Sequence, residues 1–312
     1  MDNKLILLYL LPVLIALFLT FNNKEKEFEI ISVHDHIQDL DRASFFLEAM
    51  DKTNIKQIWL VGSPDATIYK DRQGFEGYDK NNEELLKIIE TYPDKFVAFC
   101  TIKPEDPEKL NKLKNCISKG AKGLKLYTGH SLFYTVPLND PLMDEIYSYV
   151  EENKIPITFH VNGGKYQNEF EEVLKKYPNM IINCAHFCLL SLKLDELGYL
   201  LDTYPNLYID ISFGSFAQEG LERLSKDPEK YSAFVVKYSD RILFGIDLVI
   251  TDNPTKTTEY IVDMTNCYKD FLEEDKYSCF LSEGMLNGLN LNDDILKRIY
   301  EENPQKLIQV SQ

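Results

Sequence analysis

The chain has 312 residues, of which 44% are hydrophobic and 27% are charged, as in an ordinary folded protein. Its formal net charge is −16, its sequence pI is about 4.8, and its basic residues form no cluster. Nucleic acid is therefore excluded as an expected partner, because binding to a phosphate backbone depends on clustered lysine and arginine. Acidity of this degree favours solubility and carries no information about the fold.

Residues 1–28 differ in character from the rest of the chain. Residues 5–21 are an uncharged, mostly apolar run, and a polar tether follows at residues 22–27. A helix rises about 1.5 Å per residue, so this run would span roughly 25 Å, just short of a bilayer's hydrocarbon core. No Ala-x-Ala cleavage site follows it. We expect an uncleaved, single-helix membrane anchor that holds an extracytoplasmic domain; the alternative is a cleaved signal and a secreted protein.

From residue 29 onward, short apolar stretches rich in β-branched residues alternate with longer amphipathic ones. Helices are expected at 43–51, 83–91, 107–119, 141–153 and 168–176. Loops that determine which substrate binds are expected at 61–81, 128–140 and 212–230. Eight strands are predicted, at 29–33, 56–60, 96–100, 123–127, 156–160, 180–185, 207–211 and 242–245.

These repeated strand–helix units favour a parallel sheet of the α/β class. Eight units in about 280 residues fit a closed (β/α)8, or TIM, barrel over residues 29–312. An open doubly wound sheet is the alternative, but no Gly-x-Gly-x-x-Gly motif follows a predicted strand.

Four of the five histidines stand at the carboxyl ends of predicted strands. His34 and His36 are two residues apart, so they lie on the same side of the first strand. His160 and His186 end the fifth and sixth strands, and Asp247 ends the eighth. In a barrel these ends converge on one mouth, where active sites lie. Imidazoles with one carboxylate suit zinc or a similar divalent ion, so the sequence predicts a metal site; structural histidines are the alternative.

Other polar residues are expected near the same mouth. Lys125 and Tyr127 share one side of the fourth strand. A buried amine is costly unless it is paired, so Lys125 is expected to bind a carboxylate such as Asp210 or Asp247, or an anionic group of the substrate. Asp210, at the end of the seventh strand, is expected to support the site by hydrogen bonding; the alternative is that it faces the site. His130 follows the fourth strand and either contacts substrate or faces solvent.

The chain has six cysteines, at positions 100, 116, 184, 188, 267 and 279. The pair at 184 and 188 brackets His186, and the other four do not have zinc-finger spacing. Most of them are expected to be buried thiols. Disulfides are the alternative if the domain lies outside the cytosol.

This arrangement resembles the amidohydrolase superfamily, in its amidohydrolase-related branch of small metal-dependent hydrolases and aminocarboxymuconate-semialdehyde-type decarboxylases. The resemblance covers about residues 29–309. It rests on His34-x-His36, Gly120-Ala-Lys-Gly-Leu-Lys-Leu126, His160, Asn183-Cys-Ala-His186, Leu207-Tyr-Ile-Asp210, Arg241-Ile-Leu-Phe-Gly-Ile-Asp247 and Glu302-Asn-Pro-Gln-Lys-Leu-Ile308.

The resemblance implies a role for each site residue. His34, His36 and His160 would ligate one divalent ion, expected to be zinc with manganese as the alternative, and a second metal is left open. Asp247 would ligate the ion or take a proton from its water, whose pKa a divalent ion can lower to about 7. His186 would orient substrate, shuttle a proton or hold a second metal.

The resemblance also bears on Lys125 and on the reaction. In binuclear relatives a lysine of the fourth strand is carbamylated and bridges two metals, which is a further alternative for Lys125. We expect a metal-dependent hydrolase of a small amide, lactone or ester. A metal-dependent decarboxylase on the same scaffold is the alternative, and a non-catalytic, membrane-tethered binding protein is a third interpretation that the complete ligand set disfavours.

Overall fold

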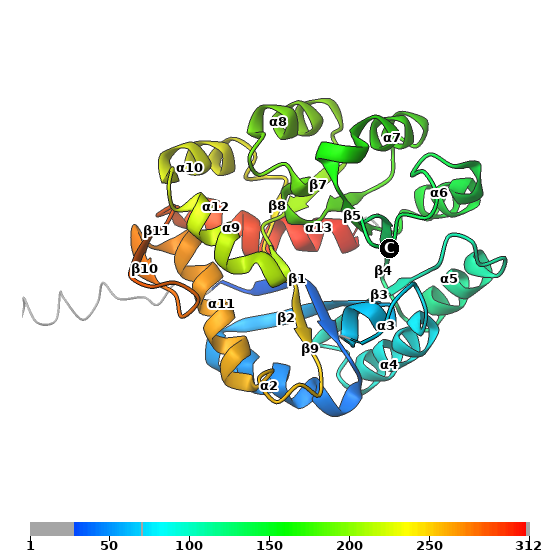
Figure 1. Cartoon of the computed structure of the whole chain (residues 1–312), viewed down its shortest axis with the longest axis horizontal. Helices are drawn as coiled ribbons and strands as arrows, with labels where there is room; N and C mark the ends of the chain where they lie inside the picture. Colours follow the sequence, from blue (N-terminus) through cyan, green and yellow to red (C-terminus); the bar gives the residue numbers. More distant parts are fainter. Residues whose placement is uncertain (1–27, 70, 310–312) are drawn as a thin grey trace, which may run out of the picture.

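One curved, parallel sheet forms the centre of the molecule and closes into a barrel (Figure 1). The computed structural model describes residues 28–69 and 71–309, and the sheet order within them is β8-β7-β6-β5-β4-β3-β2-β1-β9. The strands are β1 (Ile30–Ile37), β2 (Ile55–Val61), β3 (Phe96–Thr101), β4 (Gly123–Gly129), β5 (Ile157–Val161), β6 (Ile182–Cys184), β7 (Leu207–Asp210), β8 (Ile242–Leu243) and β9 (Leu248–Ile250).

The eighth position of the barrel is shared by β8 and β9. β8 pairs with β7, β9 pairs with β1, and the residues between them bridge the gap. Val33 N donates to Phe244 O at 2.9 Å, and Asp247 N donates to His34 O at 2.7 Å. The predicted (β/α)8 barrel is therefore confirmed. The predicted eighth strand is shorter than expected, because the chain turns through a left-handed residue at Asp247, with a φ of 61°.

Helices surround the sheet (Figure 1). Two of them, α3 and α9, lie inside stretches predicted as loops, and α4 begins earlier than predicted. The helices are α2 (Ala43–Thr53), α3 (Asp65–Ile68), α4 (Tyr78–Thr91), α5 (Lys109–Ser118), α6 (Asp144–Glu152), α7 (Gly163–Lys176), α8 (Leu194–Thr203), α9 (Ala217–Leu224), α10 (Pro228–Lys237), α11 (Thr258–Glu273), α12 (Asp293–Lys297) and α13 (Asn303–Gln309). A hairpin, β10 (Lys276–Ser278) and β11 (Met285–Asn287), follows α11.

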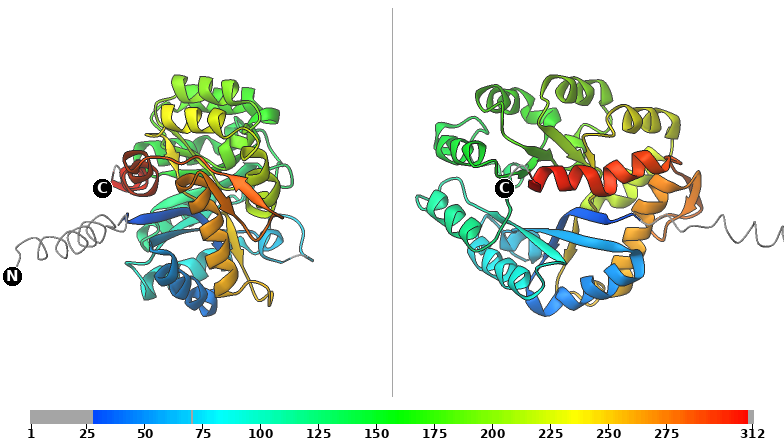
Figure 2. Two further views of the ribbon diagram at one scale, coloured as in Figure 1. Left: turned by 90° about the vertical axis from the view of Figure 1, so that its left-hand side faces the viewer. Right: turned by 180° about the vertical axis from the view of Figure 1, so that it is seen from behind.

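Most buried apolar side chains pack in two separate layers, one outside the barrel and one inside it. A large cluster packs between the sheet and the helices, and a smaller one lies inside the barrel. Leu307 of α13 belongs to the inner cluster, together with Val33, Trp59 and Phe99. Seen from behind, α13 crosses one end of the barrel (Figure 2). The site therefore opens at the other end, where the strands have their carboxyl ends.

The predicted membrane anchor at residues 5–21 lies outside the described residues. Within 28–69 and 71–309, no helix is long and apolar enough to cross a membrane.

The prediction that most cysteines are free thiols is wrong. All six are paired: Cys100 of β3 with Cys116 of α5, Cys184 of β6 with Cys188, and Cys267 of α11 with Cys279. The spacing of the cysteines along the chain does not predict these disulfides, because each pair is brought together by the packing of a helix or turn against an adjacent element. The alternative, disulfide bonding, is the one observed.

Candidate metal centre and active site

β1 reaches the mouth of the barrel through an irregularity that turns its histidines toward the interior. Ser32 pairs with Ile58 of β2 and Asp35 pairs with Leu60, so β1 advances three residues where β2 advances two. Such a bulge reverses the alternation of side chains and is common beside active sites. Asp35 holds the bulged strand, because it accepts hydrogen bonds from Ser32 Oγ at 2.5 Å and from Leu248 N of β9 at 2.9 Å.

Four of the predicted site residues, three histidines and Asp247, converge at this point. His36 Nε2 lies 2.9 Å from Asp247 Oδ1, and His34 Nε2 lies 3.6 Å from the same oxygen. His186 Nε2 lies 3.7 Å from the other carboxylate oxygen, Oδ2. The Asp247 side chain is 17% exposed, whereas the His34 side chain is fully buried. The carboxylate is thus more open to the cavity than the imidazole of His34.

The remaining ring nitrogens of these histidines are held by hydrogen bonds that define their tautomers. His34 Nδ1 donates to Asp210 Oδ2 at 3.0 Å, because a carboxylate can only accept. His36 Nδ1 donates to Ser63 Oγ at 2.7 Å, since that hydroxyl donates to the carbonyl of Val61. Both rings therefore leave Nε2 without a hydrogen, as a lone pair that can bind a cation. This is the orientation that metal-ligating histidines adopt through their outer partners.

Asp210 connects two histidines of the site. Besides accepting from His34, it accepts from the amide of Asn183 at 2.9 Å, the backbone N of His186 at 3.0 Å and Ser212 Oγ at 2.5 Å. Ser212 Oγ in turn accepts from His186 Nδ1 at 2.8 Å. The expected supporting role of Asp210 is consistent with this position and stays a prediction.

Electrostatic effects keep these groups in the ionisation states that a cation site requires. Burial acts to raise the pKa of Asp247, but the neighbouring imidazoles, with His34 first, outweigh burial and hold that pKa well below its usual value. Burial, followed by the nearby ammonium of Lys125, lowers the pKa of His34 from 6.5 to about 4. Burial also lowers the pKa of His36. At neutral pH the site therefore combines a carboxylate with neutral imidazoles.

Lys125 has a different partner from the carboxylates that the sequence suggested. Its fully buried Nζ lies 2.8 Å from His34 Nε2, and no described ion pair within 4.0 Å joins it to Asp210 or Asp247. Burial lowers its pKa from 10.5 to about 8, although both carboxylates act in the opposite direction. A lysine in this state can release its proton near neutral pH, and its amine lies beside the nitrogen that faces the site.

His160 and His130 lie next to each other on the far side of the site. Their rings are 4.3 Å apart, and the ring of His160 is 4.7 Å from that of His186. Two groups of described residues could hold a metal by their spacing, His34 with His36 and Asp247, and His34 with His186 and Asp210. His160 belongs to neither group, so its role as a ligand stays a prediction.

A cavity of about 860 Å³ opens above these residues. Its lining includes every histidine of the chain, together with Lys125, Tyr127, Phe133 and Asp247. His130 is half-buried here and its ring packs on Phe133 with centroids 5.0 Å apart, so it does not lie freely in solvent. The Tyr127 hydroxyl donates to the carbonyl of Gly62 at 3.0 Å, which leaves its ring as a wall of the cavity.

The sequence interpretation missed three residues that organise the site. Ser63, Ser212 and Asp35 each bind a site histidine or the strand that carries one. Ser63 and Ser212 each follow a predicted strand within a few residues, which is a signal that could have identified them. The sequence contains no such signal for Asp35, because its role in holding β1 depends on the bulge.

Comparison with protein families gives a match. The sequence model of the family described as amidohydrolase matches residues 68–310, most of the chain. No curated protein matches the chain.

Solved structures show the same fold at low sequence identity. A probable 2-pyrone-4,6-dicarboxylic acid hydrolase of Acinetobacter baumannii superimposes with a TM-score of 0.62 at 17% identity, and the match covers 90% of this chain and 99% of that one. An uncharacterized TIM-barrel protein of Bordetella bronchiseptica gives 0.61 at 17% identity with the same coverage. 5-Carboxyvanillate decarboxylase of Sphingomonas paucimobilis gives 0.55 at 11% identity, again covering 90% and 99%. On the strength of the family match, the chain belongs to the amidohydrolase family of TIM-barrel enzymes.

Proposed function

We propose that the protein is a metal-dependent hydrolase that directs an activated water at a small amide, lactone or ester. The observation that carries the proposal is the position of Asp247. Its Oδ1 is 2.9 Å from His36 Nε2, while its Oδ2 faces His186 Nε2 at 3.7 Å. One carboxylate at the base of the cavity therefore contacts a candidate metal ligand with one oxygen and leaves the other near a proton acceptor.

The side chains fit a divalent ion. His34, His36 and Asp247 each offer a ligand atom, and these atoms lie within 4.8 Å of one another. Nitrogen and carboxylate ligands suit zinc, and manganese is the alternative. We propose His160 as the remaining protein ligand, on the strength of the family resemblance. An ion held here would supply Lewis acidity and a water that ionises near neutral pH.

The chain's own residues supply the proton transfers. Asp247 Oδ2 accepts the proton of the attacking water, and the proton then passes to the leaving group. His186 has its Nδ1 hydrogen bonded to Ser212, so its Nε2 is free to orient substrate or hold that proton. Ligation of an ion by His34 requires Lys125 to turn away from Nε2, toward an anionic group of the substrate. Carbamylation of Lys125 is the alternative.

Metal analysis tests the site directly. The purified protein should hold about one divalent ion per chain, and His34→Ala should lose most of it while the barrel stays folded. His130→Ala is the matched control, because this histidine lines the same cavity but belongs to neither candidate ligand group. Retention of a full metal complement by His34→Ala would contradict the proposed ligand set.

Product analysis tests the reaction. A screen of small amides, lactones and esters should find a substrate to which the metal-loaded enzyme adds water. A screen of carboxylated aromatic and enol acids should release no CO2. Release of CO2 without addition of water would instead favour the decarboxylase.

The three disulfides support a location outside the cytosol, because disulfides persist in oxidising compartments and are rare where thiols are kept reduced. We further propose that residues 5–21 anchor the domain to a membrane. Full-length protein should then sediment with membranes, and a protein that starts at residue 24 should not. If expression of the full-length sequence instead gives a soluble protein whose first residue lies after about residue 21, the segment is a cleaved signal.

A further inference from the structure

The segment after β6 carries His186 on a left-handed turn made of four residues that are not glycine. The φ angles of residues 186, 187, 188 and 189 are 61°, 52°, 56° and 51°. L-residues avoid this region because Cβ approaches the following carbonyl, and such residues usually occur singly. A conformation of this kind persists only where the surrounding structure imposes it.

Backbone hydrogen bonds join the turn to the residues on either side of it. Cys188 N donates to Ala185 O, and Leu190 N donates to Phe187 O, both at 2.9 Å. The Cys184–Cys188 disulfide supplies a covalent constraint, since it joins the last residue of β6 to the third residue of the turn across a sequence separation of 4. Both cysteines are fully buried. The disulfide therefore closes the turn at its base.

The shape of this turn determines where the His186 ring lies. The ring is 5.0 Å from that of His34 and 4.7 Å from that of His160, and the residue is only 8% exposed. Its Nε2 faces Asp247 Oδ2 at 3.7 Å. A change in the backbone of residues 186–189 would move this nitrogen, because the ring is carried on the first residue of the turn.

We propose that the Cys184–Cys188 disulfide is a positioning device, which maintains the left-handed turn and thereby aims His186 Nε2 at Asp247 in the substrate cavity. The activity readout of this inference rests on the proposed hydrolase. Removal of the disulfide slows the chemical step and leaves the barrel folded, because short closed loops stabilise the folded state less than long ones.

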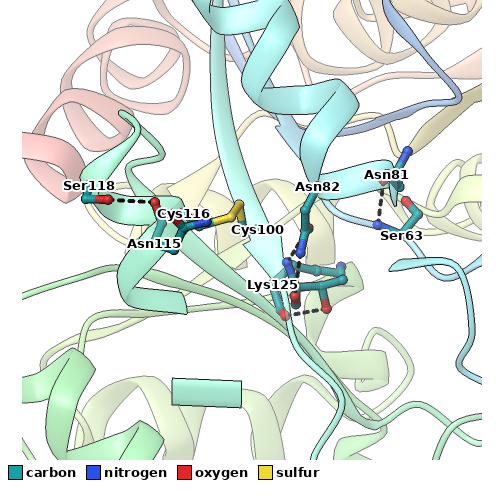
Figure 3. Close-up of a disulfide and its surroundings, with 9 residues drawn as sticks. Ser63, Asn81, Asn82, Cys100, Asn115, Cys116, Ser118 and Lys125 are labelled. Atoms are coloured by element: carbon teal, nitrogen blue, oxygen red, sulfur yellow. Dashed lines mark hydrogen bonds between the residues drawn. A yellow bond between two sulfur atoms is a disulfide. The ribbon is translucent and has the colours of Figure 1, made fainter. Parts of the chain in front are cut away.

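The chain offers a matched control in its other disulfides. Cys267–Cys279 spans 12 residues between α11 and the segment after β10, and neither cysteine lines the cavity. Its removal should lower the melting temperature more than removal of Cys184–Cys188. Cys100–Cys116 is less suitable, because the residue after Cys100, Thr101, donates its hydroxyl to the carbonyl of Lys125 at 2.9 Å; Figure 3 draws this disulfide together with Lys125.

Hydrogen exchange of the metal-free protein tests the turn without any assay of activity. In Cys184→Ala/Cys188→Ala, peptides covering residues 185–190 should exchange faster than in the wild type, because amide hydrogen bonds of the turn, among them those of Cys188 and Leu190, open. In Cys267→Ala/Cys279→Ala, the same peptides should exchange as in the wild type. Unchanged exchange in the first variant would overturn the proposal.

Kinetics on the metal-loaded enzyme test the consequence. Cys184→Ala/Cys188→Ala should lower kcat by about 10²-fold, the effect of a misplaced catalytic group, with little change in KM or metal content. Adding His186→Ala to this variant should cause almost no further loss, because the two changes remove the same contribution. Equal kcat in the Cys184→Ala/Cys188→Ala variant and the wild type, or full additivity with His186→Ala, would contradict the positioning role.

A glycine variant separates the backbone effect from a general loss of stability. Glycine adopts the left-handed region without steric cost, so Cys184→Ala/Cys188→Gly should recover part of the lost kcat and of the exchange protection. The glycine variant also provides a test of the proposal if the double-alanine variant does not fold. No recovery relative to the alanine variant would count against the proposal. If the wild type hydrolyses no substrate, the proposed hydrolase fails, and hydrogen exchange still decides whether the disulfide holds the turn.

Discussion

Asp247 is the residue on which the proposed chemistry depends most. Its backbone N binds the carbonyl of His34, its φ of 61° turns the chain between β8 and β9, and its two oxygens face different imidazoles. The backbone thus holds the carboxylate in place independently of its charge. A substitution that keeps the shape of the side chain but removes the charge should therefore separate catalysis from folding.

Asp247→Asn is expected to leave the melting temperature of the metal-free protein near that of the wild type. It should lower kcat by about 10²-fold or more, the usual scale for a lost general base. Thermal unfolding and turnover, measured on one metal-loaded preparation, check this. Near wild-type turnover would remove Asp247 from the mechanism. Loss of folding would make it structural and leave His186 as the next proton acceptor.

At the scale of single elements, the amino terminus of α7 packs on the turn that carries His186. A Cβ added to Gly163, the first residue of α7, would lie 2.7 Å from Cys188 O and 2.9 Å from a methyl of Leu190. The absence of a side chain lets the helix approach the turn this closely. A Cβ at the next residue, Gly164, would meet only Asn162 Oδ1 at 3.6 Å, an ordinary contact.

Gly163→Ala should push the turn away from α7, destabilise the protein by about 1–3 kcal/mol and lower kcat, because overpacking displaces the backbone of His186. Gly164→Ala is the matched control, with kcat unchanged and stability equal or raised by up to about 1 kcal/mol through helix propensity. Urea unfolding and turnover of both variants check this. Similar effects from the two substitutions would mean that the close contact at Gly163 has no consequence.

At the scale of the whole molecule, the barrel concentrates groups with altered ionisation at its mouth. Burial lowers the pKa of His34 from 6.5 to about 4, and it lowers those of His36 and His160 in the same direction. In each case the unfolded chain binds a proton more readily than the folded one. The contribution of these histidines to the free energy of unfolding of the metal-free protein should therefore fall as the pH drops from about 6.5 to 4, while Asp35, whose pKa burial raises, acts in the opposite direction.

The contribution of His34 alone to this loss is on the order of 3 kcal/mol, from about 1.4 kcal/mol per pKa unit. Asp247 and Asp210, whose pKa values are lowered, extend the loss to still lower pH. Urea unfolding with a chelator at pH 7, 6 and 5 measures the effect. A free energy of unfolding that does not change over this range would mean that the site histidines are protonated as readily in the folded chain as in the unfolded one.

Properties that depend on residues close together in the chain could be predicted from the sequence. Runs of apolar, β-branched residues predicted the eight strand positions, and the order of strands and helices predicted a parallel barrel. The placement of His34, His36, His160 and His186 near strand ends located the mouth of the barrel, since parallel strands bring their carboxyl ends together. The resemblance to the amidohydrolases, which these motifs carried, is confirmed by the family match.

Only the tertiary structure decided how these residues meet. The bulge between Ser32 and Asp35 depends on the pairing of β1 with β2, and the break at Asp247 depends on closure of the sheet against β1. The partner of Lys125, the cysteine pairs and the left-handed turn at His186 likewise depend on packing between segments far apart or on covalent closure. Propensity and periodicity act over a few neighbouring residues, whereas these features arise from contacts across the barrel. For that reason the sequence determined which residues gather at the mouth, and the fold determined which atoms of those residues face one another.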